Sequence, residues 1–419
     1  MNKHYILFIW FSLLLVTFSC KKDMHDGGIV ITSFNPTEGT PGNAINIKGK
    51  GFGNSINVVK LLFNGTEATV TAITDTLIST TVPVNATTGK ITVSVNGKNG
   101  ESITDFIILP GVWIRKKDVP YSDVLAPNSG SPGRVYASGF AIGNKGYVGG
   151  GTSPNKDGVG PYLTDWLEYD PSTDQWTSKA GFPFTAGLIV GVSFTINDKG
   201  YVGIGHSKNN FTNEFWQYDP ATDHWTRKAD FPGSWKKSAI GFGVGSKGYM
   251  GLGESWDSLG AYARSDWWEN DPATDHWTRK TDFPGGSKSD AAGFVINDKI
   301  YLGCSHLTTD WWEYDAATDH WTGKADYPNK FNGGSSGFVI GNKGYIAGGI
   351  EGKCWEYDPS LDKWTQEYSF FDSSRGAGVA FAIGNKGYFT TGSGCVDHPW
   401  LPLLPCGPQN DLWEFTPTK

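Results

Sequence analysis

The sequence contains few residues of the kinds that usually carry enzyme chemistry. Among 419 residues there are 5 cysteines, 8 histidines and 3 methionines. No HExxH or P-loop motif and no cluster of Cys and His stands out, so we expect neither a metal nor another cofactor. Lys and Arg number 35 against 42 Asp and Glu, a net charge of −7. Because no basic block occurs beyond the N-terminus, we exclude nucleic acid as a partner.

Long hydrophobic runs are also missing, except at the N-terminus. Residues 1–20 read MNKHYILFIWFSLLLVTFSC, a basic start followed by an apolar run, and predict a secretory signal peptide. The ending TFSC resembles a bacterial lipobox, which implies a lipid on Cys20; the alternative is a plain signal peptide with a coincidental cysteine. The following KKDMHD resembles the segment that sends Bacteroidetes-type lipoproteins to the outer surface. We therefore expect a tether over residues 21–28 in an outer-membrane lipoprotein, exposed at the cell surface or facing the periplasm. The lipid is then its one membrane attachment.

Four cysteines remain after Cys20. Cys395 and Cys406 flank a Pro-rich loop, and export to an oxidising compartment favours a disulfide between them. Cys304 and Cys354 stand at strand positions of a repeat described below, which predicts buried thiols.

Residues 29–110 differ from the rest of the chain in having little Trp and many Thr, Val, Ile and Asn. Alternating runs over 31–53, 58–73, 78–84 and 89–98, broken by Pro and Gly turns, predict a small β-sandwich. The segment resembles an IPT/TIG immunoglobulin-like domain through NPTEGTPG, the IKGKGFG turn and its closing strand. The resemblance implies a spacer or binding module on an exported protein.

A tyrosine-glycine phrase, such as GYVGGG, recurs six times after residue 110. Each copy is followed by a phrase like WEYDP, and five copies continue into one like DHWTRKADFP. The spacing of 43 to 54 residues and the short β-like runs predict propeller blades of four strands. The six tyrosines of the repeat are Tyr147, Tyr201, Tyr249, Tyr301, Tyr345 and Tyr388.

These phrases resemble the kelch motif, with its Gly-rich strand end, Tyr-Asp-Pro turn and following Trp. The resemblance implies an all-β, six-bladed kelch propeller over residues 111–419. The order of phrases indicates how the ring closes: the segment around Trp113 reads as a fourth strand without the other three, and the C-terminus lacks that strand. We therefore expect the Trp113 segment to complete the last blade.

Repetition assigns many polar and aromatic residues to the scaffold. Most of the 18 tryptophans stand in repeat columns and are expected between blades. The His of each Asp-His-Trp turn is expected at the surface. An acidic column before the third strand is expected to brace loops through hydrogen bonds; its members are Asp165, Glu214, Asp266, Asp310 and Asp411.

A basic column at the start of the innermost strands is the first candidate site. Arg134, Lys236, Lys288 and Arg375 occupy four of its six positions. Because innermost strands line the channel of a propeller, these cations could ring its mouth and attract an anionic group. The alternative is that they bond loop carbonyls, as the Arg of kelch repeats does.

Aromatic residues outside the repeat columns form the second candidate site. Flat exposed rings stack on sugars or anchor protein partners. They fall in loops that should share one face of the propeller, which the long loops 151–164, 254–265 and 392–410 make uneven. The residues expected to bind ligand are Trp235, Trp256, Tyr262 and Trp400, with Phe184 and Phe331 in the same loops.

Three functions fit these observations. The favoured one is a lipid-anchored, monomeric binding protein whose propeller face binds a glycan or a surface protein. The second is an enzyme, because six-bladed kelch propellers resemble exported sialic-acid mutarotases; this needs a general acid or base, for which Glu254, Asp257 and Glu351 are candidates. A galactose-oxidase-like copper site finds no matching residues. The third is a structural surface protein without a small ligand.

Overall fold

The computed structural model describes residues 28–417, except 84–85, 110, 121–132, 154–159, 185–186, 208–210, 258–259, 306–307, 330–332, 350–351, 368–373 and 397–403. The chain divides into two compact units, one ending at Ile108 and the other covering Leu109–Lys419. Cys20, with the signal peptide and the tether up to residue 27, lies outside the described residues. No helix in the described part of the chain has the length and apolar character to cross a membrane.

The first unit is a β-sandwich, as its alternating sequence predicts. One sheet has the order β1 (Val30–Asn35), β3 (Ala44–Lys50), β7 (Leu77–Thr81), β6 (Val70–Thr74), and the other β5 (Thr66–Ala68), β4 (Val59–Phe63), β8 (Ile91–Val95), β9 (Lys98–Glu101). A short 3-10 turn (Ile56–Val58) precedes β4, and β2 (Glu38–Gly39) pairs in parallel with β10 (Ile107–Ile108). Alternate residues of both sheets, such as Ile47 and Val93, share one core.

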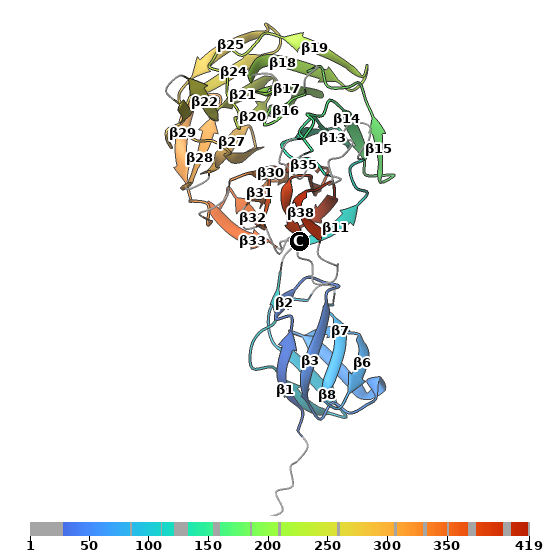
Figure 1. Ribbon diagram of the computed structural model, residues 1–419. Coiled ribbons are helices and arrows are strands. Elements are labelled where there is room, and N and C mark those ends of the chain that lie inside the picture. The colour runs from blue at the N-terminus through green and yellow to red at the C-terminus, as the bar shows by residue number, and fades with distance from the viewer. Residues whose placement is uncertain are drawn as a thin grey trace, which may run out of the picture. The chain divides into compact units, whose positions relative to one another are not determined.

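The described residues of the second unit form six four-stranded antiparallel sheets (Figure 1). The first three are β12 (Ser138–Ile142), β13 (Lys145–Gly149), β14 (Trp166–Asp170), β15 (Gln175–Ser178); β16 (Val192–Ile196), β17 (Lys199–His206), β18 (Phe211–Asp219), β19 (His224–Lys228); and β20 (Ile240–Val244), β21 (Lys247–Gly251), β24 (Trp267–Asp271), β25 (His276–Lys280). A hairpin of β22 (Glu254–Asp257) and β23 (Gly260–Ala263) interrupts the third.

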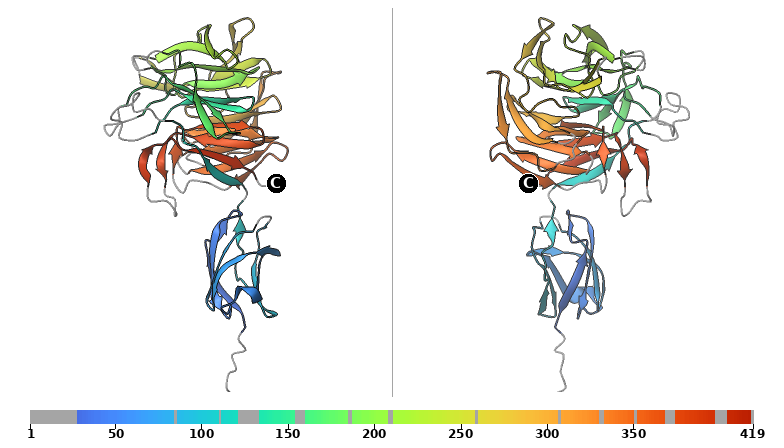
Figure 2. Two further views of the ribbon diagram at one scale, coloured as in Figure 1. Left: turned by 90° about the vertical axis from the view of Figure 1, so that its right-hand side faces the viewer. Right: turned by 60° about the vertical axis from the view of Figure 1, so that its left-hand side comes forward.

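The remaining sheets follow the same order. They are β26 (Ala292–Ile296), β27 (Lys299–Ser305), β28 (Thr308–Asp315), β29 (His320–Lys324); β30 (Ser335–Ile340), β31 (Lys343–Gly348), β32 (Lys353–Asp358), β33 (Lys363–Glu367); and β35 (Val379–Ile383), β36 (Lys386–Thr390), β39 (Leu412–Thr416), β11 (Val112–Lys116). Strands β34 (Arg375–Gly376), β37 (Ser393–Val396) and β38 (Leu404–Pro408) form a small extra sheet. Figure 2 shows β37 and β38 standing out from one face of this unit.

The sixth sheet joins the two ends of the second unit. Its outer strand is β11, which pairs antiparallel with β39, and Trp113 lies opposite Phe415. The predicted pairing of the Trp113 segment with the C-terminal strand is therefore confirmed. Each innermost strand contacts the next, from β12 through β16, β20, β26 and β30 to β35, and β35 contacts β12. The sheets are thus arranged in a propeller-like ring around a channel (Figure 1).

The glycine of the tyrosine-glycine phrase is needed where neighbouring sheets meet. A Cβ atom added to Gly200 would lie 2.0 Å from the ring of Phe140 in the preceding sheet. The same contact joins Gly387 to Phe338 at 2.1 Å. A larger side chain would force the sheets apart. The repeat tyrosines are buried, as are Trp166, Trp267 and Trp311 between sheets, which confirms their assignment to the scaffold.

The cysteines agree with the sequence where they are described. Cys304 and Cys354 are buried free thiols, as their strand positions predict. Cys395 lies on β37 and Cys406 on β38, two strands that pair, but their side chains lie outside the described residues. The disulfide between them stays a prediction.

Candidate functional site

The four cations of the basic column are buried inside the sheets and do not form an exposed ring. Arg134, Lys236, Lys288 and Arg375 are at most 3% exposed. Each one contacts the acidic column residue of its own repeat: Arg134 and Arg375 bind Asp165 and Asp411 through two hydrogen bonds each, and Lys236 and Lys288 bind Asp266 and Asp310 at 2.6 Å. The expectation that they attract a ligand is thus corrected, because their charge is neutralised within the fold.

Two structural roles predicted from the sequence explain this arrangement: hydrogen bonds from the basic column to loop carbonyls, and bracing by the acidic column. Arg134 also donates to the carbonyl of Gly150 at 3.2 Å, and Arg375 to that of Thr391 at 2.9 Å. The acidic column indeed braces the structure, since all of its carboxylates except that of Asp165 accept a further hydrogen bond. Its members also accept from the indole two residues later, in the pairs Glu214–Trp216, Asp266–Trp268, Asp310–Trp312 and Asp411–Trp413.

The fifth sheet breaks this pattern and provides a test of it. Lys353 stands where the other repeats have an acid, and the indole nitrogen of Trp355 is buried without a hydrogen-bond partner. We expect Trp355→Phe to lower the free energy of unfolding only by the packing of the lost ring atoms, because no hydrogen bond is lost. Trp268→Phe, which removes a 2.8 Å bond to Asp266, should cost about 1.5–3 kcal/mol. Urea unfolding of both variants measures the difference, and equal losses would contradict it.

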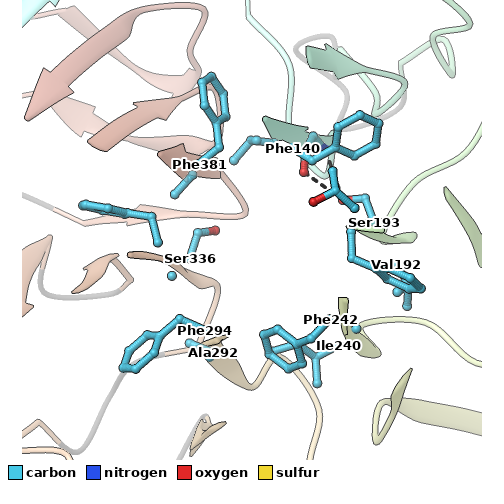
Figure 3. Close-up of a pocket in the computed structure, with 18 of the residues that line it drawn as sticks. Phe140, Val192, Ser193, Ile240, Phe242, Ala292, Phe294, Ser336 and Phe381 are labelled. Atoms are coloured by element: carbon cyan, nitrogen blue, oxygen red, sulfur yellow. Dashed lines mark hydrogen bonds between the residues drawn. The ribbon is translucent and has the colours of Figure 1, made fainter. Parts of the chain in front are cut away.

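The described wall of the channel carries few polar side chains. Its cavity of about 440 Å³ is lined by the innermost strands, and none of the described lining residues is charged. Figure 3 shows the rings of Phe140, Phe294 and Phe381 directed away from the channel centre. The hydroxyls of Ser193 and Ser336 bond to the backbone at Gly139 and Gly378. The wall therefore consists of backbone and small side chains and has no acid or base for catalysis.

A ring of residues in the left-handed backbone region surrounds one mouth of the channel. Their amides and carbonyls form consecutive bonds around the mouth, such as Tyr136 N to Ala377 O at 3.1 Å and Val190 N to Tyr136 O at 3.3 Å. This conformation is costly for β-branched Val190, and such strain is concentrated at functional sites. We call the set the mouth ring; its residues are Tyr136, Val190, Ser238, Asp290, Gly334 and Ala377.

The mouth ring lies on the face where the long loops begin. The segments that enter the innermost strands pair with residues at the start of those loops, as in Val135 with Thr152 and Lys237 with Glu254. The predicted sharing of one face by both kinds of loop is therefore confirmed. We call this face of the second unit the loop face. Asp290 brings a carboxylate to the mouth ring, and Tyr136 is 42% exposed.

Four half-buried rings form a continuous cluster on the loop face. Phe211 and Trp235 are stacked, with centroids 4.1 Å apart and planes at 20°. His206 packs edge-on against Phe211 at 4.9 Å, and its Nδ1 lies 2.8 Å from the hydroxyl oxygen of Tyr162. The stacked pair Phe211 and Trp235 is the aromatic platform. Because Trp235 and Ser238 are three residues apart, the Cα atom of Trp235 lies within about 11 Å of that of Ser238 in the mouth ring.

A charged residue, Lys237, lies between Trp235 and Ser238 in the chain. Lys237 and Glu254 form an ion pair at 3.5 Å. Burial, with the positive charge of Lys237, lowers the pKa of His206. Its imidazole is therefore neutral at neutral pH and offers one donor and one acceptor. This part of the loop face combines flat rings with hydrogen-bonding groups of both kinds.

The predicted aromatic residues have different environments. Trp235 belongs to the platform, whereas Phe184 is buried against Phe182 and is part of the scaffold. Tyr262 is exposed beside Arg264. The side chain of Trp256 and the residues Phe331 and Trp400 lie outside the described residues, as do the side chain of Asp257 and Glu351, so their roles stay predictions.

Sequence reasoning missed Tyr162 and Phe211, which complete the cluster around Trp235. Phe211 begins a strand that is longer than its counterparts in most sheets. Its position just before the repeat phrase was the signal available in the sequence. Tyr162 and Phe211 each stand four residues before the third-strand column residue of their repeat, and the other four repeats have no aromatic residue at that position.

Comparisons with known proteins agree with this architecture. Residues 30–107 match the IPT/TIG domain family. No curated protein matches the sequence. A solved structure described as the structure of YjhT is similar with a TM-score of 0.54 and 16% identity, covering 68% of this chain and 96% of that chain. As 852 solved chains match, the likeness identifies a widely used scaffold and no ligand. The chain thus contains an IPT/TIG domain, followed by a unit with a propeller-like fold.

Proposed function

We propose that this chain is an exported, lipid-anchored binding protein whose second unit, a six-bladed kelch-type propeller, binds a glycan on its loop face. The observation that carries the proposal is the aromatic platform, two half-buried rings stacked at 4.1 Å next to polar groups. A sugar presents a flat apolar face of C–H groups and a rim of hydroxyls. The platform suits the face, and His206, Tyr162 and the Lys237–Glu254 pair suit the hydroxyls.

The composition of the platform favours a sugar over a protein partner. Phe211 holds the ring of Trp235 in a fixed orientation, so little side-chain entropy is lost on binding. Protein interfaces need a larger apolar centre. A shallow ring pair among neutral hydrogen-bonding groups is better matched to one or two sugar units.

Trp235→Ala tests the proposal. We expect glycan affinity to fall at least tenfold, because the main stacking surface is lost while the propeller stays folded. Binding to an array of surface glycans, followed by calorimetry on the best ligand, measures it. Leu361→Ala is a matched control, since Leu361 is an exposed apolar residue, 70% exposed, in a turn outside the site. Equal binding by wild type and Trp235→Ala, or no glycan bound by wild type, would overturn the proposal.

A sugar isomerase like the sialic-acid mutarotases is the second candidate. Such an enzyme needs a general acid or base beside the sugar ring. Asp290 at the mouth ring, the neutral His206 and Glu254 supply groups of this type near the platform. NMR exchange between sugar anomers measures the activity. A rate no higher than that of buffer excludes this reading and leaves the binding function.

A further inference from the structure

A polar cavity of about 330 Å³ lies at the third sheet of the second unit. Ser234, the residue before Trp235, lines it, so the cavity and the platform are next to each other along the chain. Ser265 and Ser287 also line it, together with Arg264 and Arg279. The cavity therefore presents three small hydroxyl residues and two guanidinium groups.

The charges around this cavity do not cancel. Asp266 is neutralised by the buried Lys236 at 2.6 Å, and Asp282 binds Arg279 at 2.9 and 3.0 Å. Among the residues that the structure describes, Arg264 has no carboxylate within ion-pair distance. Its Nε atom is buried and has no hydrogen-bond partner. Among the described residues, one positive charge thus remains at the cavity without a carboxylate partner.

Arg264 is particular to this sheet. Its backbone amide donates to Gly253 at 2.8 Å, as Leu163 donates to Gly151 and Gln409 to Gly392 in the equivalent loops. The backbone position is thus set by the scaffold, while the side chain there is neutral in those other loops. The ring of Tyr262 lies 5.8 Å from the Arg264 guanidinium and supports it. No role in the ion pairs of the fold explains this arginine.

We infer that the Arg264 cavity binds an anionic substituent, a carboxylate or a sulfate, of a glycan held on the aromatic platform. That the ligand is a glycan rests on the proposed function, whereas its negative charge is inferred from the residues that line the cavity. A guanidinium binds either group through two parallel hydrogen bonds, and the serine hydroxyls can donate to the remaining oxygens.

The test uses glycans that share one backbone and differ in one substituent: hydroxyl, carboxylate or sulfate. We expect wild type to bind one or both charged forms at least tenfold more tightly than the neutral form. Comparing the carboxylate form with the sulfate form identifies which group the cavity prefers. Arg264→Met should abolish this preference and leave binding of the neutral glycan unchanged. Arg227→Met is the matched control, because Arg227 pairs with Asp230 at 3.0 Å on the second sheet as Arg279 pairs with Asp282.

The outcomes separate the two proposals. Trp235→Ala should weaken all glycans, whereas Arg264→Met should weaken the charged ones. Equal affinity of wild type for neutral and charged glycans, or an unchanged preference in Arg264→Met, overturns the inference and leaves the platform in place. If wild type binds no glycan, the proposed function fails, and calorimetry with sodium sulfate then tests the cavity alone. Sulfate binding that is at least tenfold weaker in Arg264→Met than in wild type supports an anion site in the cavity. Equal sulfate binding by the two proteins overturns the anion site.

Discussion

Replacing Arg375 with methionine is expected to lower the free energy of unfolding of the second unit by about 3–5 kcal/mol. Arg375 is fully buried and donates to both oxygens of Asp411, at 2.6 and 2.9 Å, and to the carbonyl of Thr391. Burial acts to raise the pKa of Asp411, but Arg375 and the Trp413 indole keep it low. The variant leaves a buried carboxylate with only the indole as partner, next to the sheet that joins the two ends of the unit.

A double-mutant cycle with Asp411→Asn separates the pair from its surroundings. The double variant should lose less than the sum of the single variants, because no unpaired charge remains. Arg227→Met is the matched control: its pair with Asp230 is half exposed and should be worth less than about 1 kcal/mol. Chemical denaturation followed by tryptophan fluorescence measures wild type and the four variants. A loss in Arg375→Met as small as that in Arg227→Met would contradict the structural role of the basic column.

Glu367→Gln is expected to stabilise the second unit increasingly as pH rises. Burial, with the negative charge of Glu356, raises the pKa of Glu367 to about 8. Its Oε2 is buried without a hydrogen-bond partner. The residue pairs with Cys354, at the place where the other sheets have Lys228 opposite Phe215 and Lys280 opposite Trp267. The fifth sheet thus buries an acid where its neighbours carry a base.

The direction of the pH dependence follows from the raised pKa. Between pH 4.5 and about 8 the folded protein keeps the proton of Glu367, whereas the unfolded chain has released it. The stability that this group contributes is fully present below pH 4.5 and is lost as pH rises through 8. Glutamine has no such cost. The variant should match wild type near pH 4.5 and exceed it by on the order of 4 kcal/mol near pH 8.

Thermal unfolding of both proteins between pH 4.5 and 9 measures this effect. Glu269→Gln gives a control of opposite sign, because Lys247 and Tyr249 hold the pKa of Glu269 below its ordinary value despite burial. That variant should be less stable than wild type at neutral pH. A constant difference between Glu367→Gln and wild type across the range would show that Glu367 does not titrate as its surroundings indicate.

The repeat made most of the second unit predictable. A glycine before the tyrosine, an acid before the third strand and a tryptophan after it recur in register, and each has a local reason that is repeated sheet by sheet. The pairing of the Trp113 segment with the last strand was predictable because the last repeat lacks the fourth-strand phrase and the Trp113 segment has that phrase alone. Trp235 could be identified for a related reason: it stands outside every column, so packing of the repeat does not account for it.

The partners of the basic column could not be predicted from the repeat. The sequence places Arg134, Lys236, Lys288 and Arg375 at the start of innermost strands, and composition says nothing about their partners. In the fold each meets the carboxylate that begins the third strand of its own repeat, about 22 to 36 residues away. Two columns interpreted separately, one as a ligand site and one as bracing, are two halves of the same ion pairs.

The sequence by itself therefore determined the secondary structure, the repeat and the residues of its scaffold, because these depend on periodic local patterns and on burial that every sheet repeats. Only the tertiary structure decided which charges are neutralised and which remain. Ion pairing depends on distances between side chains that are remote in sequence. The low dielectric of the interior makes an unpaired buried charge costly and a buried pair strongly coupled. For that reason the cations that recur proved structural, and the arginine that does not recur, Arg264, is the one for which we propose a ligand.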